Sequence, residues 1–247
     1  MSANLRLLIL TDTHYTGPDG LLAPAPEGLR AERAPRLIRE AMQQADRTGG
    51  FEAVALLGDL ISSGNPADQA RAALAELRSA VATSAGARPV LVVPGNHDGD
   101  PEAVLSAFDQ RPGEWEIAGC RVITFADPFD CDGASRRAAA DFARLKALAR
   151  RDGGPIIALQ HYPIHLGRAI EPRDYYVVPT NVPDILEQYA QLHVTLSLSG
   201  HLHVGDPLHS HRGVLYYTAR PLTAPPFYFA IAVLQGFNVL ISRATLE

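Results

Sequence analysis

Residues 91–100 read LVVPGNHDGD, and this stretch decides how the rest of the sequence is interpreted. Its first residues are apolar and mostly β-branched, which is typical of a strand buried in a sheet. A proline and a glycine follow, and then an amide, an imidazole and a carboxylate in Asn96, His97 and Asp98. Because such side chains bind metals and carry protons, the stretch predicts a functional loop at the end of a buried strand.

The same pattern of a short apolar run followed by a polar loop recurs along the chain. Strands are expected at residues 5–10, 52–58, 90–95, 121–126, 155–160 and 194–200. Helical patterns lie between several of them, at residues 34–47, 66–83, 101–108, 135–151 and 182–192. This alternation indicates an α/β layered fold. Three later runs, at 213–219, 227–233 and 238–244, have turn signals and no helix between them, which suggests a closing antiparallel hairpin region.

Two of the expected helices carry start signals. Ser135 can cap the helix that Gly153 and Gly154 end, and Asn181 can cap the last helix, which has Pro183 in its first turn. Each of these polar side chains is expected to accept a hydrogen bond from a backbone N–H of the first helical turn.

Polar side chains follow five of the expected strands. They are Asp12 and His14, then Asp59, then Asn96, His97 and Asp98, then His161, and finally His201 and His203. A single strand-end histidine more often makes only a structural hydrogen bond, but five strands delivering such residues form a specific pattern. The carboxyl ends of strands are where open α/β sheets bind ligands. Imidazole together with carboxylate suits Zn, Fe or Mn, so we expect a metal centre there.

Taken together, the motifs Asp12/His14, Gly58-Asp59, Gly95-Asn96-His97-Asp98, His161 and Gly200-His201-x-His203 resemble the calcineurin-like metallophosphoesterase superfamily. Their order and loop lengths are most similar to the bacterial class III branch, which hydrolyses cyclic nucleotides and glycerophosphodiesters. The resemblance implies a four-layered α/β/β/α sandwich, in which two mixed sheets are flanked by helices. It spans residues 12–203, and we expect residues 1–247 to form one such domain.

The resemblance also implies two divalent metal ions, Mn, Fe or Zn, and a ligand set for each. The first ion would be held by Asp12, His14, Asp59 and His203, and the second by Asp59, Asn96, His161 and His201. Asp59 would bridge the two ions. Two positions depart from the pattern of many relatives, because Ser62 stands where they have an acidic or amide residue and Gln160 where they often have a second histidine.

The implied reaction is attack on phosphorus by a hydroxide that bridges the two metals. His97 would face the substrate and donate a proton to the leaving alkoxide, because imidazole is suited to that transfer near neutral pH. Asp98 would either orient His97 or hold the loop through local backbone hydrogen bonds, and both roles stay open. We therefore expect His97 and Asp98 to be the catalytic pair.

Composition narrows the range of partners and compartments. The net charge is −5, and the longest basic cluster is a pair such as Arg136-Arg137, which argues against extended nucleic acid and favours a small phosphoester substrate. No run approaches the roughly 18 consecutive apolar residues that a membrane helix needs. With only Cys120 and Cys131 and no leader-like pattern, we expect a cytoplasmic protein with free thiols. The C-terminal strands could serve a homodimer.

Three functions compete, and the leading one is hydrolysis of a small phosphodiester. The same site could instead act as a phosphomonoesterase or pyrophosphatase, and a non-catalytic scaffold ranks below both because the expected ligand set is complete. Residues 162–180 are interpreted either as a solvated loop or as a lid over the substrate, with Arg168, Arg173, Tyr175 and Tyr176 as its contacts.

Overall fold

The computed structural model describes residues 3–18, 24–62, 66–128, 135–169 and 179–246. Its helices are α1 (Ala34–Arg47), α2 (Ala67–Ala85), α3 (Pro101–Ala107), α4 (Ala139–Ala149) and α5 (Val182–Gln191), with a short 3-10 helix at Ala31–Arg33. Its strands are β1 (Asn4–Leu10), β2 (Ala53–Leu57), β3 (Val90–Val93), β4 (Glu114–Ile117), β5 (Cys120–Thr124), β6 (Ile156–Leu159), β7 (Leu196–Ser199), β8 (Asp206–His211), β9 (Val214–Thr218), β10 (Tyr228–Gln235) and β11 (Asn238–Thr245).

The strands form two mixed sheets. The five-stranded sheet has the order β11-β10-β1-β2-β3, and the six-stranded sheet has the order β4-β5-β6-β7-β9-β8. In each sheet the strands that lead into the polar loops run parallel, whereas the antiparallel pairs lie toward the edges at β10, β11, β4 and β8. All the polar loops therefore leave the carboxyl ends of parallel strands.

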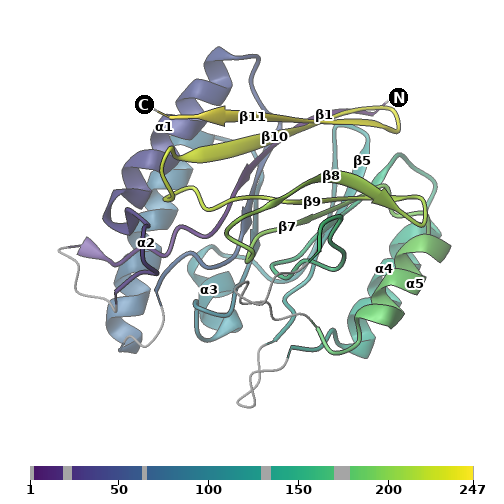
Figure 1. The fold of residues 1–247 in the computed structure, drawn as a ribbon, viewed down its shortest axis with the longest axis horizontal. Coiled ribbons are helices and arrows are strands. Elements are labelled where there is room, and N and C mark those ends of the chain that lie inside the picture. Colours follow the sequence, from purple (N-terminus) through teal and green to yellow (C-terminus); the bar gives the residue numbers. More distant parts are fainter. Residues whose placement is uncertain (1–2, 19–23, 63–65, 129–134, 170–178, 247) are drawn as a thin grey trace.

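Three apolar clusters separate four layers and follow from the two-residue period of the strands. In β1, Leu8 and Leu10 face the helices α1 and α2, whereas Leu7 and Ile9 face the other sheet. A third cluster packs the outer face of the six-stranded sheet against α4 and α5. Figure 1 shows the two helix layers on opposite sides of the two sheets. The predicted α/β/β/α sandwich is confirmed.

The C-terminal region differs from the expected hairpin. β10 and β11 do form an antiparallel hairpin, and β10 pairs with β1. β9 joins the other sheet, where it runs parallel to β7 and antiparallel to β8. The polar strands β4 and β8 were not among the predicted elements.

The expected cap of α4 by Ser135 is wrong, because the helix begins four residues later at Ala139. Arg137 lies between Ser135 and the start of α4. Its buried guanidinium makes two hydrogen bonds to Asp127, at 2.9 and 2.7 Å, and these bonds anchor this non-helical stretch. Asn181 does precede α5, but its side chain binds the backbone N–H and carbonyl of Arg137 and makes no capping bond.

Two further sequence expectations concern thiols and membranes. Cys120 is a buried free thiol, while Cys131 lies outside the described residues. In the part of the chain that the structure describes, no helix combines the length and apolar character needed to cross a membrane.

Candidate metal centre

All seven predicted metal-binding side chains are described, and they come from both sheets. The five-stranded sheet contributes Asp12 and His14 after β1, Asp59 after β2 and Asn96 after β3, and the six-stranded sheet contributes His161 after β6 and His201 and His203 after β7. Three overlapping groups of carboxylate and imidazole atoms lie close enough together to hold metal ions. The predicted gathering of strand ends is therefore present in the fold.

Asp59 lies between two histidines that belong to different expected ligand sets. Its Oδ2 is 3.7 Å from Nε2 of His14 and 3.3 Å from Nε2 of His161. Its Oδ1 accepts a hydrogen bond of 2.8 Å from the backbone N–H of His97. One carboxylate thus faces both halves of the centre, which is the geometry required of a bridging ligand.

The first half of the centre contains Asp12, His14 and His203. Nε2 of His203 is 3.6 Å from Oδ1 of Asp12 and 3.2 Å from Nε2 of His14. Asp12 is fixed in place because Oδ2 accepts a 2.6 Å hydrogen bond from the Thr11 hydroxyl and both oxygens accept from the backbone N–H of His201. The ligand atoms of Asp12, His14 and His203 all lie within 4.8 Å of one another.

The second half contains Asn96, His161 and His201. Nδ1 of His161 donates to the carbonyl oxygen of Leu57 at 2.7 Å, because a carbonyl can only accept. This bond leaves Nε2 facing the centre, where it lies 3.1 Å from Oδ1 of Asn96. The ring of Tyr162 contacts both histidine rings edge-on at centroid distances of 5.1 and 5.0 Å.

Burial and neighbouring charge set the protonation of the centre in the absence of metal. Burial lowers the pKa of His14 to about 4 and that of His201 to about 3, so both rings are neutral at pH 7 and keep a lone pair for a metal. Burial would also lower the pKa of His161, but the adjacent Asp59 carboxylate outweighs it and raises the value to about 9. Asp12 has a lowered pKa despite its burial, through its contacts with His203 and His161.

These residues fit two divalent ions. At the first half, Nε2 of His14 and Nε2 of His203 are 3.2 Å apart. A hydrogen bond between them uses the lone pair of only one nitrogen, whereas a metal ion can bind the lone pairs of both. At the second half, a metal would replace the proton that His161 carries beside Asp59. Nitrogen and carboxylate or amide oxygen donors suit Zn, Fe and Mn, and no thiol takes part among the described residues.

The backbone of the ligand loops is contorted in a way that brings the side chains together. Asp12, His14, Asp59 and His201 all have positive φ angles, of 49°, 43°, 50° and 66°. Such conformations cost about 1 kcal/mol or more in a residue other than glycine, so the surrounding fold must impose them. A Cβ at Gly58, whose φ is +88°, would lie 2.5 Å from Nδ1 of His161.

His97 and Asp98 lie beside the centre with different surroundings. The His97 ring is 4.8 Å from the His14 ring, centroid to centroid, and a His97 nitrogen forms a close group with His14 and Asp59. Asp98 accepts hydrogen bonds from the backbone N–H groups of Leu60 at 2.6 Å, Ile61 at 2.9 Å and Gly95 at 2.8 Å. These three hydrogen bonds are the backbone contacts that a loop-holding role of Asp98 requires.

The two departures from the pattern of relatives have structural partners. The hydroxyl of Ser62 donates to the carbonyl oxygen of His14 at 3.0 Å, which ties the first ligand loop to the second. Gln160 donates to the Ser197 hydroxyl at 2.9 Å and accepts from the Tyr189 hydroxyl at 2.9 Å. Both side chains therefore brace the loops that carry ligands.

Other sequence candidates lie elsewhere. His165, His209 and His211 form a separate cluster around Tyr216, with the rings of His165 and His211 stacked at 3.9 Å. Residues 170–178 of the expected lid, which include Arg173, Tyr175 and Tyr176, lie outside the described residues, whereas Arg168 is described.

Some residues that shape the centre could not be found from its motifs. Thr11 binds Asp12, and the Thr223 hydroxyl donates to the carbonyl oxygen of Asp12 at 3.3 Å. A threonine next to an aspartate is a weak signal, and Thr223 lies 211 residues further along the chain. A backbone atom, the carbonyl oxygen of Leu57, orients His161, and no residue type encodes it.

Comparison with known proteins gives one family and several structural neighbours. The calcineurin-like phosphoesterase family model matches residues 5–205. The structure resembles a dimetal phosphatase from Danio rerio with a TM-score of 0.70 and 16% identity, covering 99% of this chain and 100% of that one. It also resembles the protein TT1561 of Thermus thermophilus, with a TM-score of 0.61, 14% identity and coverage of 97% and 98%.

A third structural neighbour is GAP50, described as the anchor in the inner membrane complex of Plasmodium, with a TM-score of 0.65, 12% identity and coverage of 98% and 85%. No curated protein matches the chain. At these identities the structural neighbours show the shared fold, and the family assignment rests on the match over most of the chain.

Proposed function

The chain belongs to the calcineurin-like phosphoesterase family, and from that premise we propose that it hydrolyses small phosphodiesters of the cyclic nucleotide or glycerophosphodiester type. The family makes it a metal-dependent phosphoesterase; the choice of diester is the proposal. One observation carries the catalytic assignment: the Asp59 carboxylate stands between His14 and His161, and its other oxygen binds the backbone of His97. Asp59 thus lies next to a ligand of each proposed ion and next to the proposed proton donor.

Asp12, His14, Asp59 and His203 would hold one divalent ion, and Asp59, Asn96, His161 and His201 the other. When bound, the two ions supply an activated water and neutralise charge on the phosphate. The buried protein groups position these ligands, since Thr11 fixes Asp12 and the carbonyl oxygen of Leu57 fixes the ring of His161.

His97 is the proton donor of the proposal. Its backbone N–H is anchored to Asp59, and its ring lies beside His14 at the edge of the centre, where it can reach a group bound there. In the reaction, the water oxygen would form a new bond to phosphorus and release a proton to solvent, the bond to the leaving alcohol would break, and the alcohol oxygen would take a proton from His97, which solvent then restores. Asp98 keeps the loop of His97 in place through its three backbone bonds.

Charge supports a small substrate over a polymer. The carboxylates of Asp12 and Asp59 would cancel only half of the charge of two divalent ions, so the centre stays positive while the protein as a whole carries −5. Local charge can then bind one phosphate group, whereas a long polyanion would meet the negative surface. A small diester satisfies both conditions.

Hydrolysis of monoesters at the same site is the competing function, and the resemblance to a dimetal phosphatase supports it. A non-catalytic role is the third possibility, because GAP50, an anchor protein, has a similar fold. The convergence of all seven ligand side chains in this chain weighs against it.

The test measures turnover by stripped protein to which Mn²⁺, Fe²⁺ or Zn²⁺ is added back. Bis-p-nitrophenyl phosphate is compared with p-nitrophenyl phosphate, and then cyclic AMP with glycerophosphocholine. We expect His97→Ala to retain metal and lower kcat on the diesters by about 10² to 10⁴-fold, whereas Asn96→Ala should lose metal. His211→Ala, in β8 away from the centre, is the control. A clear preference for the monoester would refute the diesterase assignment, and metal-loaded protein inert on every substrate would refute catalysis.

A further inference from the structure

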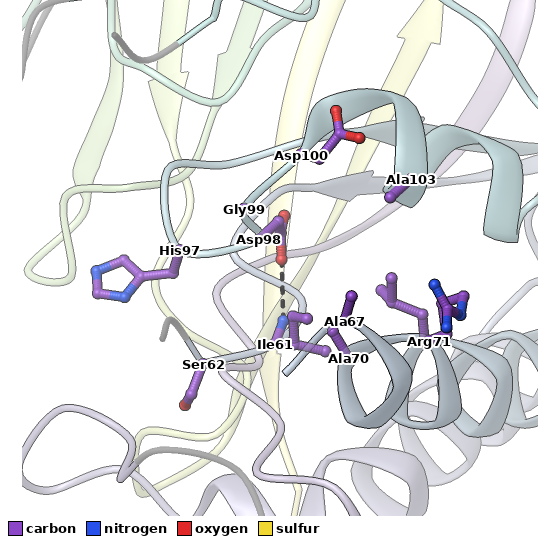
Figure 2. Close-up of a pocket in the computed structure, with 11 residues that line it drawn as sticks. Ile61, Ser62, Ala67, Ala70, Arg71, His97, Asp98, Gly99, Asp100 and Ala103 are labelled. Atoms are coloured by element: carbon purple, nitrogen blue, oxygen red, sulfur yellow. Dashed lines mark hydrogen bonds between the residues drawn. The ribbon is translucent and has the colours of Figure 1, made fainter. Parts of the chain in front are cut away.

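A cavity of about 320 Å³ adjoins His97 and lies between α2 and the loop that leads into α3. Much of its lining is apolar, with Ala67 and Ala70 on one wall, Ala103 on the other, and Ile61 close to Asp98 (Figure 2). This volume is at the lower end of the range for small-molecule sites. The cavity therefore has room for a compact organic group.

The two ends of the cavity differ in chemistry. His97 stands at one end, and its ring is turned away from the other lining residues (Figure 2). That ring contacts His14, so His97 separates the cavity from the candidate metal centre. At the opposite end, Figure 2 shows the side chain of Arg71 on α2. The cavity thus runs from the proposed proton donor to a cation.

The charged groups of the lining differ in whether they are already engaged. Both oxygens of Asp98 bind backbone N–H groups, and Asp100 accepts from the backbone N–H of Glu102 at 3.0 Å as the cap of α3. Arg71, in contrast, makes no hydrogen bond or ion pair with any residue that the structure describes. Arg71 is therefore a lining cation that remains available to a ligand.

The position of His97 decides which part of a substrate would occupy the cavity. A general acid must lie next to the oxygen that leaves, because it transfers its proton to that oxygen. The organic group attached to the leaving oxygen must then extend past His97, and this cavity is a described space that adjoins His97. The half of the diester that remains on phosphorus has no such constraint.

Resting on the proposed function, the geometry points to a substrate class: phosphodiesters whose leaving alcohol has a compact apolar body and a negatively charged end. The apolar body would lie between Ala67 on α2 and Ala103 on α3, and the anionic end would pair with Arg71. The leaving alcohol, and not the retained group, determines specificity.

The test uses methyl phosphodiesters that differ only in the group released. The series contains trifluoroethyl, phenyl, and phenyl carrying a carboxylate either directly or on an ethyl arm. We expect at least one carboxylate ester to be turned over with kcat/KM about tenfold above the plain phenyl ester, and Arg71→Gln to abolish that advantage. Ala67→Leu, which narrows the cavity, should lower kcat/KM for all the aryl esters but not for the trifluoroethyl ester.

Ala72→Leu is the matched control, because Ala72 lies on the same helix, is exposed and does not line the cavity. Binding of the free phenols to metal-loaded protein, followed by NMR, keeps the inference separate from catalysis. If no phosphoester is hydrolysed, the proposed function fails, yet tighter binding of the carboxylate phenol that disappears in Arg71→Gln would still support the cavity. Turnover of all aryl esters and binding of all phenols without preference, or a preference that survives Arg71→Gln, would overturn it.

Discussion

Two buried histidines should make the metal-free protein sensitive to mild acid. Burial lowers the pKa of His14 to about 4 and that of His201 to about 3, so both take up a proton on unfolding below about pH 6.5. The stability that they contribute is complete above pH 6.5 and is lost as the pH falls toward 4 and 3. We expect each histidine to lower the free energy of unfolding by about 2 kcal/mol between pH 7 and pH 5, whereas proton uptake by Asp98, whose pKa burial raises to about 7, acts in the opposite direction; urea denaturation measures the sum.

His161 titrates in the opposite sense and sets the limit of that experiment. Its pKa is raised to about 9 by Asp59, so its contribution is complete below pH 6.5 and is lost as the pH rises through 9. The acid side must therefore be measured below pH 7. His14→Asn should flatten the slope between pH 7 and pH 5, and an unchanged slope in that variant would contradict the assignment.

Asp98 and Asp100 provide a matched pair of loop carboxylates. Asp98 is buried and accepts three backbone hydrogen bonds, whereas Asp100 is exposed and accepts one. Asp98→Ala leaves three buried N–H groups without an acceptor and should lower the free energy of unfolding by about 3 kcal/mol or more. Asp100→Ala removes only a helix cap and should cost about 1 kcal/mol. Similar losses in the two variants, measured by chemical denaturation, would contradict this account of Asp98.

At the residue scale, the sequence predicts the side chains of the centre better than their conformations. The residue types that follow each strand were sufficient to place Asp12, Asp59 and His161 together, because parallel strands end at a common edge. The positive φ angles of Asp12 and Asp59 were not predictable, since they arise from contacts with distant loops. The exact residue that fixes a ring, such as Leu57 through its carbonyl oxygen, is hidden for the same reason.

At the element scale, a buried polar chain joins α5 to β6 and supports the strand end that carries His161. The Tyr189 hydroxyl accepts from Nη1 of Arg137 at 2.6 Å and donates to Gln160 at 2.9 Å. Tyr189→Phe leaves both partners short of a bond and should lower the free energy of unfolding by about 1–3 kcal/mol. Thermal or urea denaturation measures this cost.

Tyr216 in β9 offers the control for that substitution. It is buried, and its hydroxyl has no hydrogen-bond partner among the described residues. Tyr216→Phe removes a polar group that burial leaves unsatisfied, so it should be neutral or stabilising. If both tyrosine variants lost the same stability, the bonds of Tyr189 would not be the cause.

The inner strands of the two sheets were predicted correctly because they are continuous apolar runs. β2 and β6 are buried at every position, so their sequences are apolar throughout and stand out from the loops around them. β4 and β8 have mixed burial and polar residues such as Glu116 and His209, which short patterns do not separate from loops. The start of α4 was misplaced because the ion pair of Arg137 with Asp127 depends on tertiary packing.

At the scale of the whole molecule, the assignment of strands to sheets lies beyond local pattern. β7 and β9 are neighbours in one sheet although β8 lies between them in the chain, and β10 crosses to the other sheet to pair with β1. Apolar periodicity reports that a strand is buried but not which neighbour it selects. The family resemblance supplied the two-sheet architecture that the strand patterns alone did not.

The division of ligands between the sheets leads to a prediction about stability. Each proposed ion takes ligands from both sheets, for example Asp12 from the loop after β1 and His203 from the loop after β7. Bound metal would therefore join the two sheets at one edge, and removing it should lower the stability of the whole fold. At an ion concentration about 100 times the Kd, binding adds about 2.7 kcal/mol per ion, which corresponds to roughly 5–10 °C in Tm.

Calorimetry of stripped and reloaded protein measures this change, and two variants locate it. Asp12→Ala and His203→Ala remove ligands from opposite sheets, so both should abolish the metal-dependent rise in Tm for the ion they share. His211→Ala, in β8 outside the centre, should keep the full rise. If only one of the two ligand variants lost the rise, the ion would be held by a single sheet, and the proposed bridging of the layers would be wrong. An ion with ligands from both sheets is lost when a ligand from either sheet is removed. This arrangement therefore requires Asp12→Ala and His203→Ala to have equal effects on the metal-dependent rise in Tm.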